Sequence, residues 1–358
     1  MENINVQVYS LVSEPLTPVE KLRTIAKLGF AGAEFTADFT QVPLEEMKKV
    51  LEETGLKVHS AHVGLDQIES VLPYFAELGA KLVICPMTNF CSKAEALEVA
   101  EELNRLGRIA KPYGIKIGYH NHTDEFYKDE GKYLYDWLID ACDPEVTAFQ
   151  VDCGWCSAAG VDPVDFINSH AGRIASIHIK ENGGVIGANK PQSRHDNTPR
   201  FKIEKDADGN PIFPPEFIKM KEEHDRLNVP QGTGIVDWKA VKAAADAQCD
   251  DVIYVVEREA SYNDPQDRVA CLAEDIAWLK ANLYLQNPTR AGAAASACFS
   301  AERSPGGKSP PGLSVFSRFI SLETCRKTPQ CWIFCSSSPP PNGNAGRAFL
   351  CSAISAWS

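Results

Sequence analysis

Two periodicities of apolar residues alternate along the first 283 positions of the chain. Short runs rich in β-branched residues, such as KLVICPM (81–87) and DVIYVVERE (251–259), predict strands. Each run precedes a longer stretch in which apolar residues recur every three or four positions, as in VEKLRTIAKLG (19–29), and this spacing predicts an amphipathic helix. Such pairs occur eight times, with strands predicted over 5–11, 32–35, 57–63, 81–87, 116–122, 147–152, 173–181 and 251–259.

Eight strand–helix pairs in about 280 residues predict a (β/α)8 TIM barrel of the α/β class. The helices are predicted over 19–29, 43–55, 67–78, 93–113, 132–142, 162–172, 237–248 and 264–283. A doubly wound open sheet is the alternative, but that fold usually carries a glycine-rich phosphate loop after its first strand. Here the first strand continues into LVSEPLTPVE, which contains no such loop.

Two segments depart from the strand–helix pattern. Residues 182–230, after the seventh strand, form an insertion too long for an ordinary barrel loop, and the hairpin signal Asp208-Gly209 within it suggests a lid over the active face. Residues 284–358 are rich in Ser, Pro, Gly and Ala and have no sustained period. We therefore expect a barrel domain over 1–283 and a disordered, low-complexity tail over 284–358, either a non-functional extension or a segment with an interaction role.

Composition narrows the range of partners. The 358 residues are 44% hydrophobic and 23% charged, which is ordinary for a globular protein. The net charge of −12 argues against nucleic acid or an anionic membrane as a partner, and no apolar run reaches the roughly 20 residues of a membrane span. The N-terminus shows no signal peptide, and the scattered cysteines fit reduced thiols, so we expect a cytoplasmic protein. A homo-oligomer is compatible with the sequence.

One cysteine pair could carry chemistry of its own. Cys153 and Cys156 form a C-x-x-C motif, which occurs in redox proteins and in zinc sites. The sequence holds no second C-x-x-C to complete a zinc site, and the motif follows an Asp at a strand end rather than opening a helix. Buried, reduced thiols are the simpler interpretation.

Polar side chains collect where the predicted strands end. In TIM barrels the chemistry lies at the C-terminal ends of the strands, so these positions are the first candidates for a site. A single strand histidine is more often a hydrogen-bonded core residue than a metal ligand, but here nitrogen and oxygen donors converge from several strands. The strand-end residues include His62, His120, Asn121, His122, Asp152, His178, Lys180 and Glu257, with Glu125 just beyond the fifth strand.

This mixture of donors predicts a divalent metal site. Carboxylates and imidazoles together suit Mn²⁺, Zn²⁺, Co²⁺ or Fe²⁺. Removing that many charged groups from water without a cation would be energetically unfavourable. Asp152, His178 and Glu257 end the sixth, seventh and eighth strands and face the histidines of the fifth, so these donors are expected around one point.

At this point the chain resembles a known family, the sugar phosphate isomerase/epimerase superfamily of xylose isomerase-like barrels. The resemblance covers about residues 3–283. Its motifs are GYHNHTDEF (118–126), QVDCGW (150–155) with AGVDPVDFI (159–167), AGRIASIHIKE (171–181), GTGIVDWKAV (232–241) and YVVERE (254–259). The DNA-cleaving endonuclease IV branch, which needs three zinc ions and a basic face, fits poorly with the acidic barrel.

The resemblance implies one divalent metal, Mn²⁺ in the first place, held by Asp152, His178 and Glu257. The fourth ligand is His120 where the family's epimerases have Glu, with Glu125 as the other candidate. This departure puts the epimerases' pair of facing glutamates in doubt. The family's usual Gly-Glu-Gly turn is also altered, because Thr233 stands where Glu is common.

The implied reaction begins with removal of a proton next to a carbonyl and passes through an enediolate. Glu257 is the candidate base, with His122 and Lys180 as further catalytic candidates, and the substrate contacts are expected from His62, Asn121, Glu125 and Trp155. Trp155 is as plausible a core residue as a sugar contact.

These expectations make a sugar or keto-sugar isomerase or epimerase the first functional hypothesis. A metal-dependent dehydratase or lyase of a keto sugar or cyclitol is the alternative, and a non-catalytic sugar-binding barrel is a distant third. The substrate is a small sugar or cyclitol in each case. The absence of a compact Lys/Arg cluster at the last two strand ends favours an unphosphorylated one.

Overall fold

The computed structural model describes residues 4–206, 211–248, 251–263 and 266–284. The chain divides into two units, Met1–Gln286 and Asn287–Ser358. Only the first contains described residues. The disorder expected for the tail therefore concerns a segment that lies outside the described residues.

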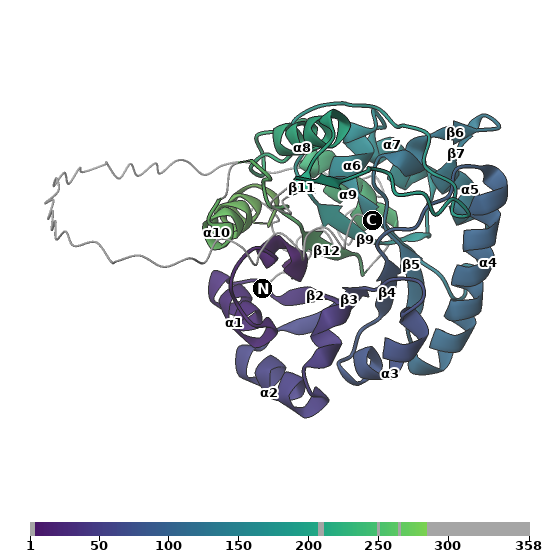
Figure 1. Cartoon of the computed structure of the whole chain (residues 1–358). Helices are drawn as coiled ribbons and strands as arrows, with labels where there is room; N and C mark the ends of the chain where they lie inside the picture. Colours follow the sequence, from purple (N-terminus) through teal and green to yellow (C-terminus); the bar gives the residue numbers. More distant parts are fainter. Residues whose placement is uncertain (1–3, 207–210, 249–250, 264–265, 285–358) are drawn as a thin grey trace, which may run out of the picture. The chain divides into compact units, whose positions relative to one another are not determined.

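Eight parallel strands form the barrel that the sequence predicts (Figure 1). Neighbouring strands hydrogen-bond in the order β5-β4-β3-β2-β1-β12-β9-β8. The last gap, between β5 and β8, is bridged by the residue pairs Ile117–Thr147 and His120–Gln150. The strands are β1 (Ile4–Gln7), β2 (Gly32–Thr36), β3 (Lys57–His62), β4 (Leu82–Cys85), β5 (Lys116–Tyr119), β8 (Phe149–Asp152), β9 (Ile174–Ile179) and β12 (Ile253–Val256).

Each predicted helix occurs, with bounds that differ by a few residues. Thr17 begins the first helix with a capping box to Glu20, and Gly29 ends it in the left-handed conformation that glycine favours. The helices are α1 (Pro18–Leu28), α2 (Leu44–Thr54), α3 (Ile68–Glu77), α4 (Lys93–Ala110), α5 (Leu134–Ala141), α6 (Cys153–Ala158), α7 (Pro163–Ser169), α8 (Pro215–Leu227), α9 (Trp238–Gln248) and α10 (Arg268–Leu279). Two of these, α6 and α8, were not predicted.

The strands are shorter than predicted, mainly at their C-terminal ends. The first ends at Gln7, and residues Val8–Leu11 form a 3-10 helix (η1). On β5, β9 and β12 the regular strand ends before the last predicted residues, although the backbone N–H groups of His120 and Glu257 still bond carbonyls of the neighbouring strands. His120, Lys180 and Glu257 lie just beyond these strand ends, whereas Asp152 and His178 belong to β8 and β9 themselves.

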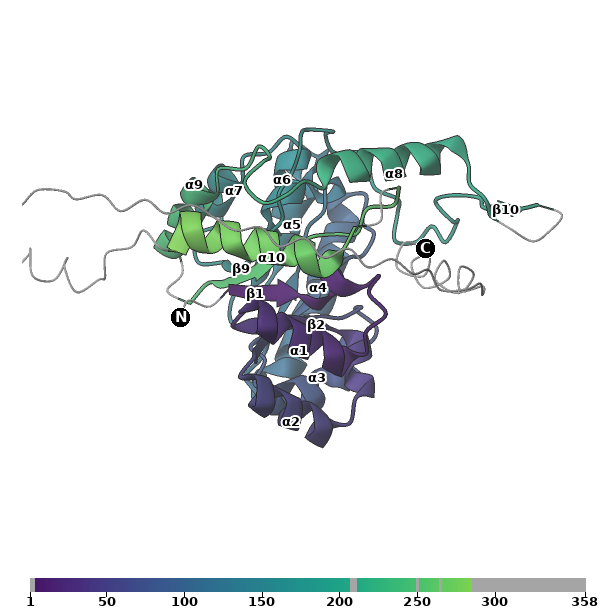
Figure 2. The same ribbon diagram turned by 90° about the vertical axis from the view of Figure 1, so that its left-hand side faces the viewer.

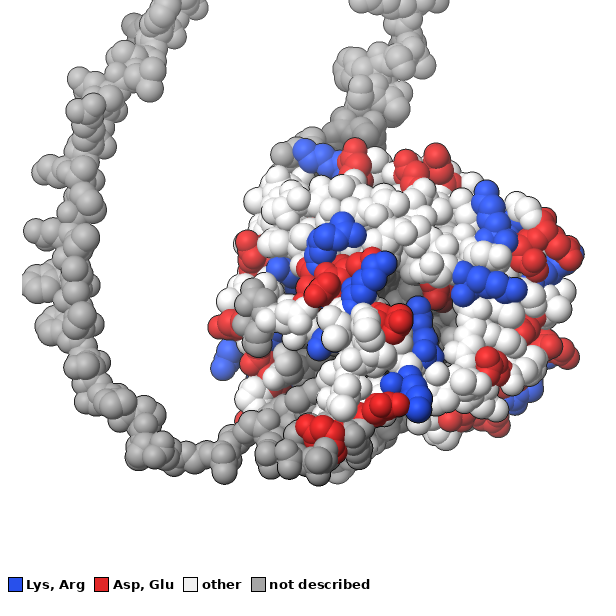
Figure 3. Space-filling view, turned by 45° about the horizontal axis from the view of Figure 1, so that its top comes forward, with Lys and Arg blue, Asp and Glu red and all other residues white. Residues whose placement is uncertain are grey.

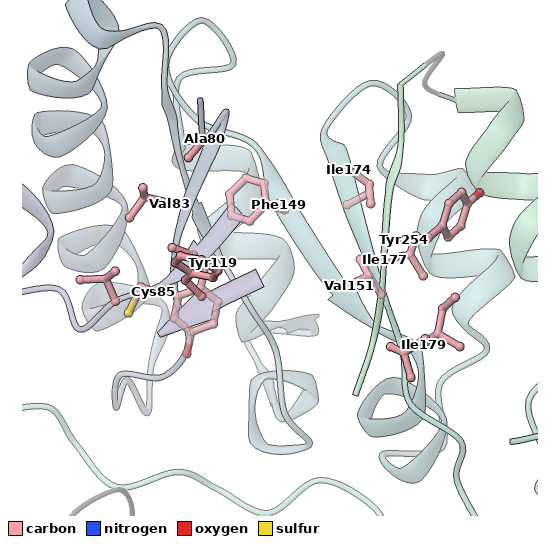
Figure 4. Close-up of a cluster of buried hydrophobic side chains, with 14 of the residues drawn as sticks. Ala80, Val83, Cys85, Tyr119, Phe149, Val151, Ile174, Ile177, Ile179 and Tyr254 are labelled. Atoms are coloured by element: carbon pink, nitrogen blue, oxygen red, sulfur yellow. The ribbon is translucent and has the colours of Figure 1, made fainter. Parts of the chain in front are cut away.

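The main hydrophobic core lies between the barrel and its helices. Outward-facing strand residues, among them Val83, Tyr119, Ile177 and Tyr254, join the apolar faces of the helices in one buried cluster (Figure 4). A second, small cluster of Leu82, Ile84 and Ala148 lies inside the barrel. Gly118 borders it, and a Cβ there would come within 2.6 Å of the Ala148 carbonyl oxygen. Apolar packing therefore closes one part of the interior.

The insertion after β9 contains more structure than the predicted hairpin. Its short strands β10 (Glu204–Lys205) and β11 (Pro211–Ile212) pair antiparallel, while the turn residues predicted between them lie outside the described residues. Helix α8 follows and lies across the barrel from α1, α2 and α3 (Figures 1 and 2). A strap before the hairpin reaches α4, where the Ser193 hydroxyl donates to Glu95 at 2.5 Å.

A second small hairpin follows β5, where β6 (Lys128–Asp129) pairs with β7 (Lys132–Tyr133) after the 3-10 turn η4 (Asp124–Phe126). The remaining short elements are the 3-10 turns η2 (Ala37–Gln41) and η3 (Lys111–Tyr113) and the π-helical turn η5 (Lys280–Tyr284). On the face shown in Figure 3, acidic and basic side chains are interspersed. None of the described helices is both long and apolar enough to span a bilayer.

Candidate metal centre and active site

Four buried side chains from four strand ends converge inside the barrel. The potential ligand atoms of His120, Asp152, His178 and Glu257 all lie within 4.8 Å of one another. His178 Nδ1 lies 3.2 Å from Glu257 Oε2 and 3.7 Å from Asp152 Oδ2. This set, which we name the metal layer, contains the four residues that the sequence and its resemblance pointed to, with His120 rather than Glu125 as the fourth.

Local structure fixes the position of Asp152. It ends β8 and caps α6, because its Oδ1 accepts a hydrogen bond from the Trp155 backbone N–H at 2.7 Å. The Asn121 amide bonds the Asp152 backbone on both sides, accepting from its N–H at 3.0 Å and donating to its carbonyl at 3.1 Å. Asn121 therefore positions Asp152, and the substrate contact expected of it stays a prediction.

The metal layer fits a divalent cation. Asp152 Oδ2 is buried and has no hydrogen-bond partner in the described part of the chain, which is an uncommon state for a carboxylate oxygen. Glu34, Asp152 and Glu257 all approach His178, so three carboxylates surround a single imidazole. Two imidazoles with two carboxylates form a donor set that suits Mn²⁺, Fe²⁺, Co²⁺ or Zn²⁺.

Electrostatics keep these groups away from their ordinary titration ranges. Burial raises the pKa of Asp152 to about 6, against the opposing effect of His178. Burial, assisted by the nearby His178 and His62, lowers the pKa of His120 well below its usual value. His120 is therefore a neutral imidazole near pH 7, the form in which histidine binds metals.

A second layer of polar side chains lies two residues further along the chain, beyond the ends of β5, β9 and β12. Side chains at positions i and i+2 face the same side of an extended chain, so His122, Lys180 and Glu259 extend the columns begun by His120, His178 and Glu257. Lys180 Nζ lies 3.6 Å from Glu259 Oε2 and 4.6 Å from the centre of a Trp155 ring. We name His122, Lys180, Glu259 and Trp155 the upper layer.

Burial and hydrogen-bonding capacity suit the upper layer for a polar ligand. The Trp155 ring centre is 5.7 Å from that of His122, and burial lowers the pKa of His122 to about 4. Trp155 Nε1 is buried without a hydrogen-bond partner in the described residues. Gly154 lets α6 approach β9, since a Cβ there would lie 2.4 Å from the Lys180 carbonyl oxygen.

The insertion contributes one histidine to this layer. His224 of α8 is buried and hydrogen-bonds Glu259, and its ring centre lies 4.9 Å from that of Tyr262 and 6.1 Å from that of Trp155. Sequence reasoning missed His224, because the insertion was interpreted only as a hairpin. The sequence of residues 215–227 has the spacing of an amphipathic helix with an apolar or aromatic residue near its end. This pattern could have predicted the helix that carries His224.

Two residues predicted to bind substrate have internal hydrogen-bond partners, and one of them, His62, lies against the rings of His120 and His178. Glu125 accepts hydrogen bonds from the Tyr119 hydroxyl at 2.7 Å and from the His122 backbone N–H at 2.8 Å. His62 Nε2 lies 2.7 Å from Gln150 Oε1 and 3.0 Å from Glu34 Oε1. The substrate contacts expected of both stay predictions.

Glu34 and Gln150 are further residues that the sequence analysis missed. Glu34 lies in β2 and is fully buried. Although burial acts to raise it, the imidazoles of His62 and His178 lower the pKa of Glu34 to about 2. Glu34 could have been recognised in the sequence, because it is a charged residue inside the otherwise apolar strand GAEFT.

The C-x-x-C pair is completely buried, but the expectation that the motif does not open a helix is wrong, because Asp152 caps α6 and Cys153 is its first residue. Burial raises the pKa of both the Cys153 and Cys156 thiols well above the usual value. Such thiols are poor nucleophiles, which agrees with the interpretation of the pair as buried and reduced.

A parallel barrel with acid, base and imidazole groups at the C-terminal ends of its strands has the layout of TIM-barrel enzymes. Residues 22–282 match the model of one family in that class, described as the xylose isomerase-like TIM barrel. The chain belongs to this family, and the resemblance seen in the sequence is confirmed.

The chain is similar in sequence to a curated dehydratase and in fold to several solved structures. An inosose dehydratase of Clostridium beijerinckii is 29% identical over 177 residues, which cover 46% of this chain and about half, 54%, of that protein. The structure of a sugar phosphate isomerase/epimerase from Parabacteroides distasonis matches with a TM-score of 0.58 and 20% identity, covering 79% of this chain and 96% of that one. The IOLI protein, solved with a bound zinc atom, gives a TM-score of 0.55 at 12% identity, covering 78% and 97%.

Proposed function

We propose that the protein is a divalent-metal-dependent dehydratase of a keto sugar or keto-cyclitol. The observation that carries the proposal is the asymmetry of the metal layer. Of its two carboxylates, Asp152 is held by its helix-capping bond, and Glu257 faces imidazoles rather than a second glutamate. Epimerisation needs a proton carrier on each face of the substrate, whereas elimination can begin with one base. The inosose dehydratase named above supports the same reaction class.

The metal would be held by His120, Asp152, His178 and Glu257, with Mn²⁺ as the first candidate and Zn²⁺, Co²⁺ or Fe²⁺ as alternatives. The zinc atom named for the IOLI protein supports a divalent ion in this fold. When bound, the ion supplies Lewis-acid polarisation of a substrate carbonyl, which makes the neighbouring C–H acidic.

Side chains of the metal layer and the upper layer carry the remaining catalytic and binding roles. Glu257 removes the proton from the carbon next to the carbonyl, since it is the carboxylate of the metal layer without a helix-capping bond. Lys180 lies one layer above and donates hydrogen bonds to the departing hydroxyl as negative charge develops on its oxygen. His122 is neutral near pH 7 and exchanges hydrogen bonds with a ring hydroxyl. The face of Trp155 completes the binding surface beside Lys180.

Charge around the site favours a substrate without phosphate. Glu34, Asp152, Glu257 and Glu259 are buried acids, and Lys180 is the basic residue that lies among them. A bound divalent ion together with Lys180 would leave the cluster slightly negative. A phosphate dianion would be repelled there, whereas a neutral polyol would not.

Isomerisation or epimerisation of a keto sugar is the second candidate. Its first step is the same proton removal by Glu257. The observation that favours it is His122, a neutral buried imidazole in the layer above, which could return a proton to a different position. A non-catalytic sugar-binding barrel is a third possibility and predicts neither metal binding nor proton exchange.

One set of incubations separates the three. Purified protein with one equivalent of Mn²⁺ is mixed in D₂O with inosose and with several keto sugars. Deuterium appearing next to the carbonyl identifies the shared first step. New ultraviolet absorbance from an unsaturated carbonyl product identifies dehydration, and a changed sugar profile without it identifies isomerisation. Neither exchange nor product with any substrate, in protein that carries metal, contradicts both enzymatic proposals.

A further inference from the structure

A buried group of hydrogen-bonding side chains lies beside the metal layer, and its centre is Glu34. Oε1 of Glu34 accepts from Gln7 Nε2 at 2.8 Å and pairs with His178 Nε2 at 2.7 Å. Oε2 accepts from Ser60 Oγ at 2.6 Å and from Gln150 Nε2 at 2.8 Å. Donors therefore approach both oxygens of Glu34, which matches an acceptor-only carboxylate.

This carboxylate dictates the orientation of the Gln150 amide. The NH₂ of Gln150 faces Glu34 and also donates to Ser176 Oγ at 2.9 Å, while Ser176 itself donates to the Ile253 carbonyl at 3.1 Å. The reversed amide would place its carbonyl oxygen against a carboxylate, with no proton between them. The Gln150 carbonyl oxygen must therefore point the other way, toward two histidines.

The orientation of Gln150 in turn decides which ring nitrogens carry protons. Its Oε1 lies 2.9 Å from His120 Nδ1 and 2.7 Å from His62 Nε2, so both nitrogens must donate. A neutral His120 then carries its lone pair on Nε2. On the other side, His178 donates from Nε2 to Glu34, so its lone pair, when neutral, is on Nδ1, the nitrogen nearest to Asp152 and Glu257.

We propose that Glu34 and Gln150 form a tautomer-setting platform, which orients His120 and His178 so that each presents a lone pair to the metal. Glu34 acts on His178 directly and on His120 through Gln150. Both are positioning residues, and neither contacts substrate. The inference rests on the proposed metal site, but not on which substrate the protein turns over.

Metal binding by Glu34→Gln tests the platform. Metal-free protein is titrated with Co²⁺ by calorimetry, and the visible spectrum of the saturated form is recorded. An amide cannot accept at both ends, so either His178 or Gln150 loses its acceptor. Loss of such an outer partner typically weakens metal affinity by about 10–100-fold, and we expect a loss in this range. The Co²⁺ absorption bands should keep their positions, because the ligands themselves are unchanged.

Ser60→Ala is the matched control, since it removes one donor to Glu34 but contacts neither metal-binding histidine. It should bind Co²⁺ with nearly the parent's affinity. A purely structural role would lower the unfolding midpoint of Glu34→Gln but leave its Co²⁺ affinity unchanged, and that result overturns the platform. If Glu34→Gln does not fold, Gln150→Met tests the His120 side by the same criterion.

The parent protein separates this inference from the proposed function. If it binds no Co²⁺, the platform and the metal-dependent enzyme both fail. If the parent binds Co²⁺ and the variants weaken binding as expected, but no inosose or keto sugar reacts, the platform stands and the proposed function fails.

Discussion

Glu125 gives the protein a measurable loss of stability as the pH rises. Its carboxyl group is buried, and burial raises its pKa to about 7 from the ordinary 4.5, although Tyr119 and the His122 backbone donate hydrogen bonds to it. Between these two pH values the folded protein holds a proton that the unfolded chain has released. Stability therefore falls as the pH rises through this window, because the folded state binds more protons than the unfolded one. The difference in pKa corresponds to about 3 kcal/mol.

Glu125→Gln removes this titration while keeping the hydrogen bonds. The glutamine oxygen can accept from the His122 N–H, and its NH₂ can donate to the Tyr119 oxygen, which in turn can donate to the Thr88 carbonyl at 3.2 Å. Below pH 4.5 parent and variant should differ little. Above pH 7 the variant should be more stable than the parent by up to about 3 kcal/mol, since only the parent must bury a charge.

Urea unfolding at pH 5 and pH 8, followed by circular dichroism, measures this difference. At each pH, the free energy of unfolding of the parent is subtracted from that of the variant. The two differences are then compared, because the contributions of the other titrating groups cancel. Glu45→Gln is the matched control: the Glu45 side chain is 87% exposed, so the same substitution should show no such change. If Glu125→Gln differs from the parent by the same amount at both pH values, the burial argument is wrong.

Three further predictions concern the site. Asp152→Ala should lose bound metal as measured by elemental analysis, and retention of stoichiometric metal would remove Asp152 from the ligand set. His224→Leu should raise KM by about tenfold or more with metal content unchanged, because Glu259 loses its hydrogen-bond partner and keeps only Lys180 at 3.6 Å. His195→Leu, an exposed histidine of the same insertion, should behave as the parent. Gly154→Ala should lower the free energy of unfolding by about 1–3 kcal/mol, since its Cβ would press on the Lys180 carbonyl just beyond β9, and an unchanged urea midpoint would contradict this.

The barrel could be predicted from the sequence because the pattern that indicates each strand–helix pair is local and is repeated eight times. Every strand–helix pair carries its own change of period, so errors of a few residues at Leu11 or Tyr113 do not alter the topology. Helix α6 was missed because it is short and begins directly after Asp152, where the C-x-x-C motif was interpreted as following a strand end rather than opening a helix. Helix α8 was missed because a turn signal inside the insertion outweighed the helical pattern that follows it.

The candidate ligands could be predicted because strand ends converge by symmetry in a parallel barrel, so no tertiary contact had to be known. Glu34 and Gln150 could not be placed in the same way. Each lies within a strand, where a polar residue faces either the barrel interior or the helices according to register. Which of the two applies depends for Glu34 on the pairing of β2 with β1 and β3, and for Gln150 on the pairing of β8 with β9.

The layering of the site, in contrast, was present in the sequence as a spacing. Three strand ends carry polar residues two positions apart: His120 with His122, His178 with Lys180, and Glu257 with Glu259. Since alternate residues of an extended chain face the same way, each pair places one group in the metal layer and one in the upper layer. The same spacing after Asp152 gives Gly154 instead, and the absence of a side chain there admits the carbonyl of Lys180. The pattern of polar residues thus separates the proposed metal ligands from the proposed substrate contacts, and a substitution in one layer should leave the other layer's ligand in place.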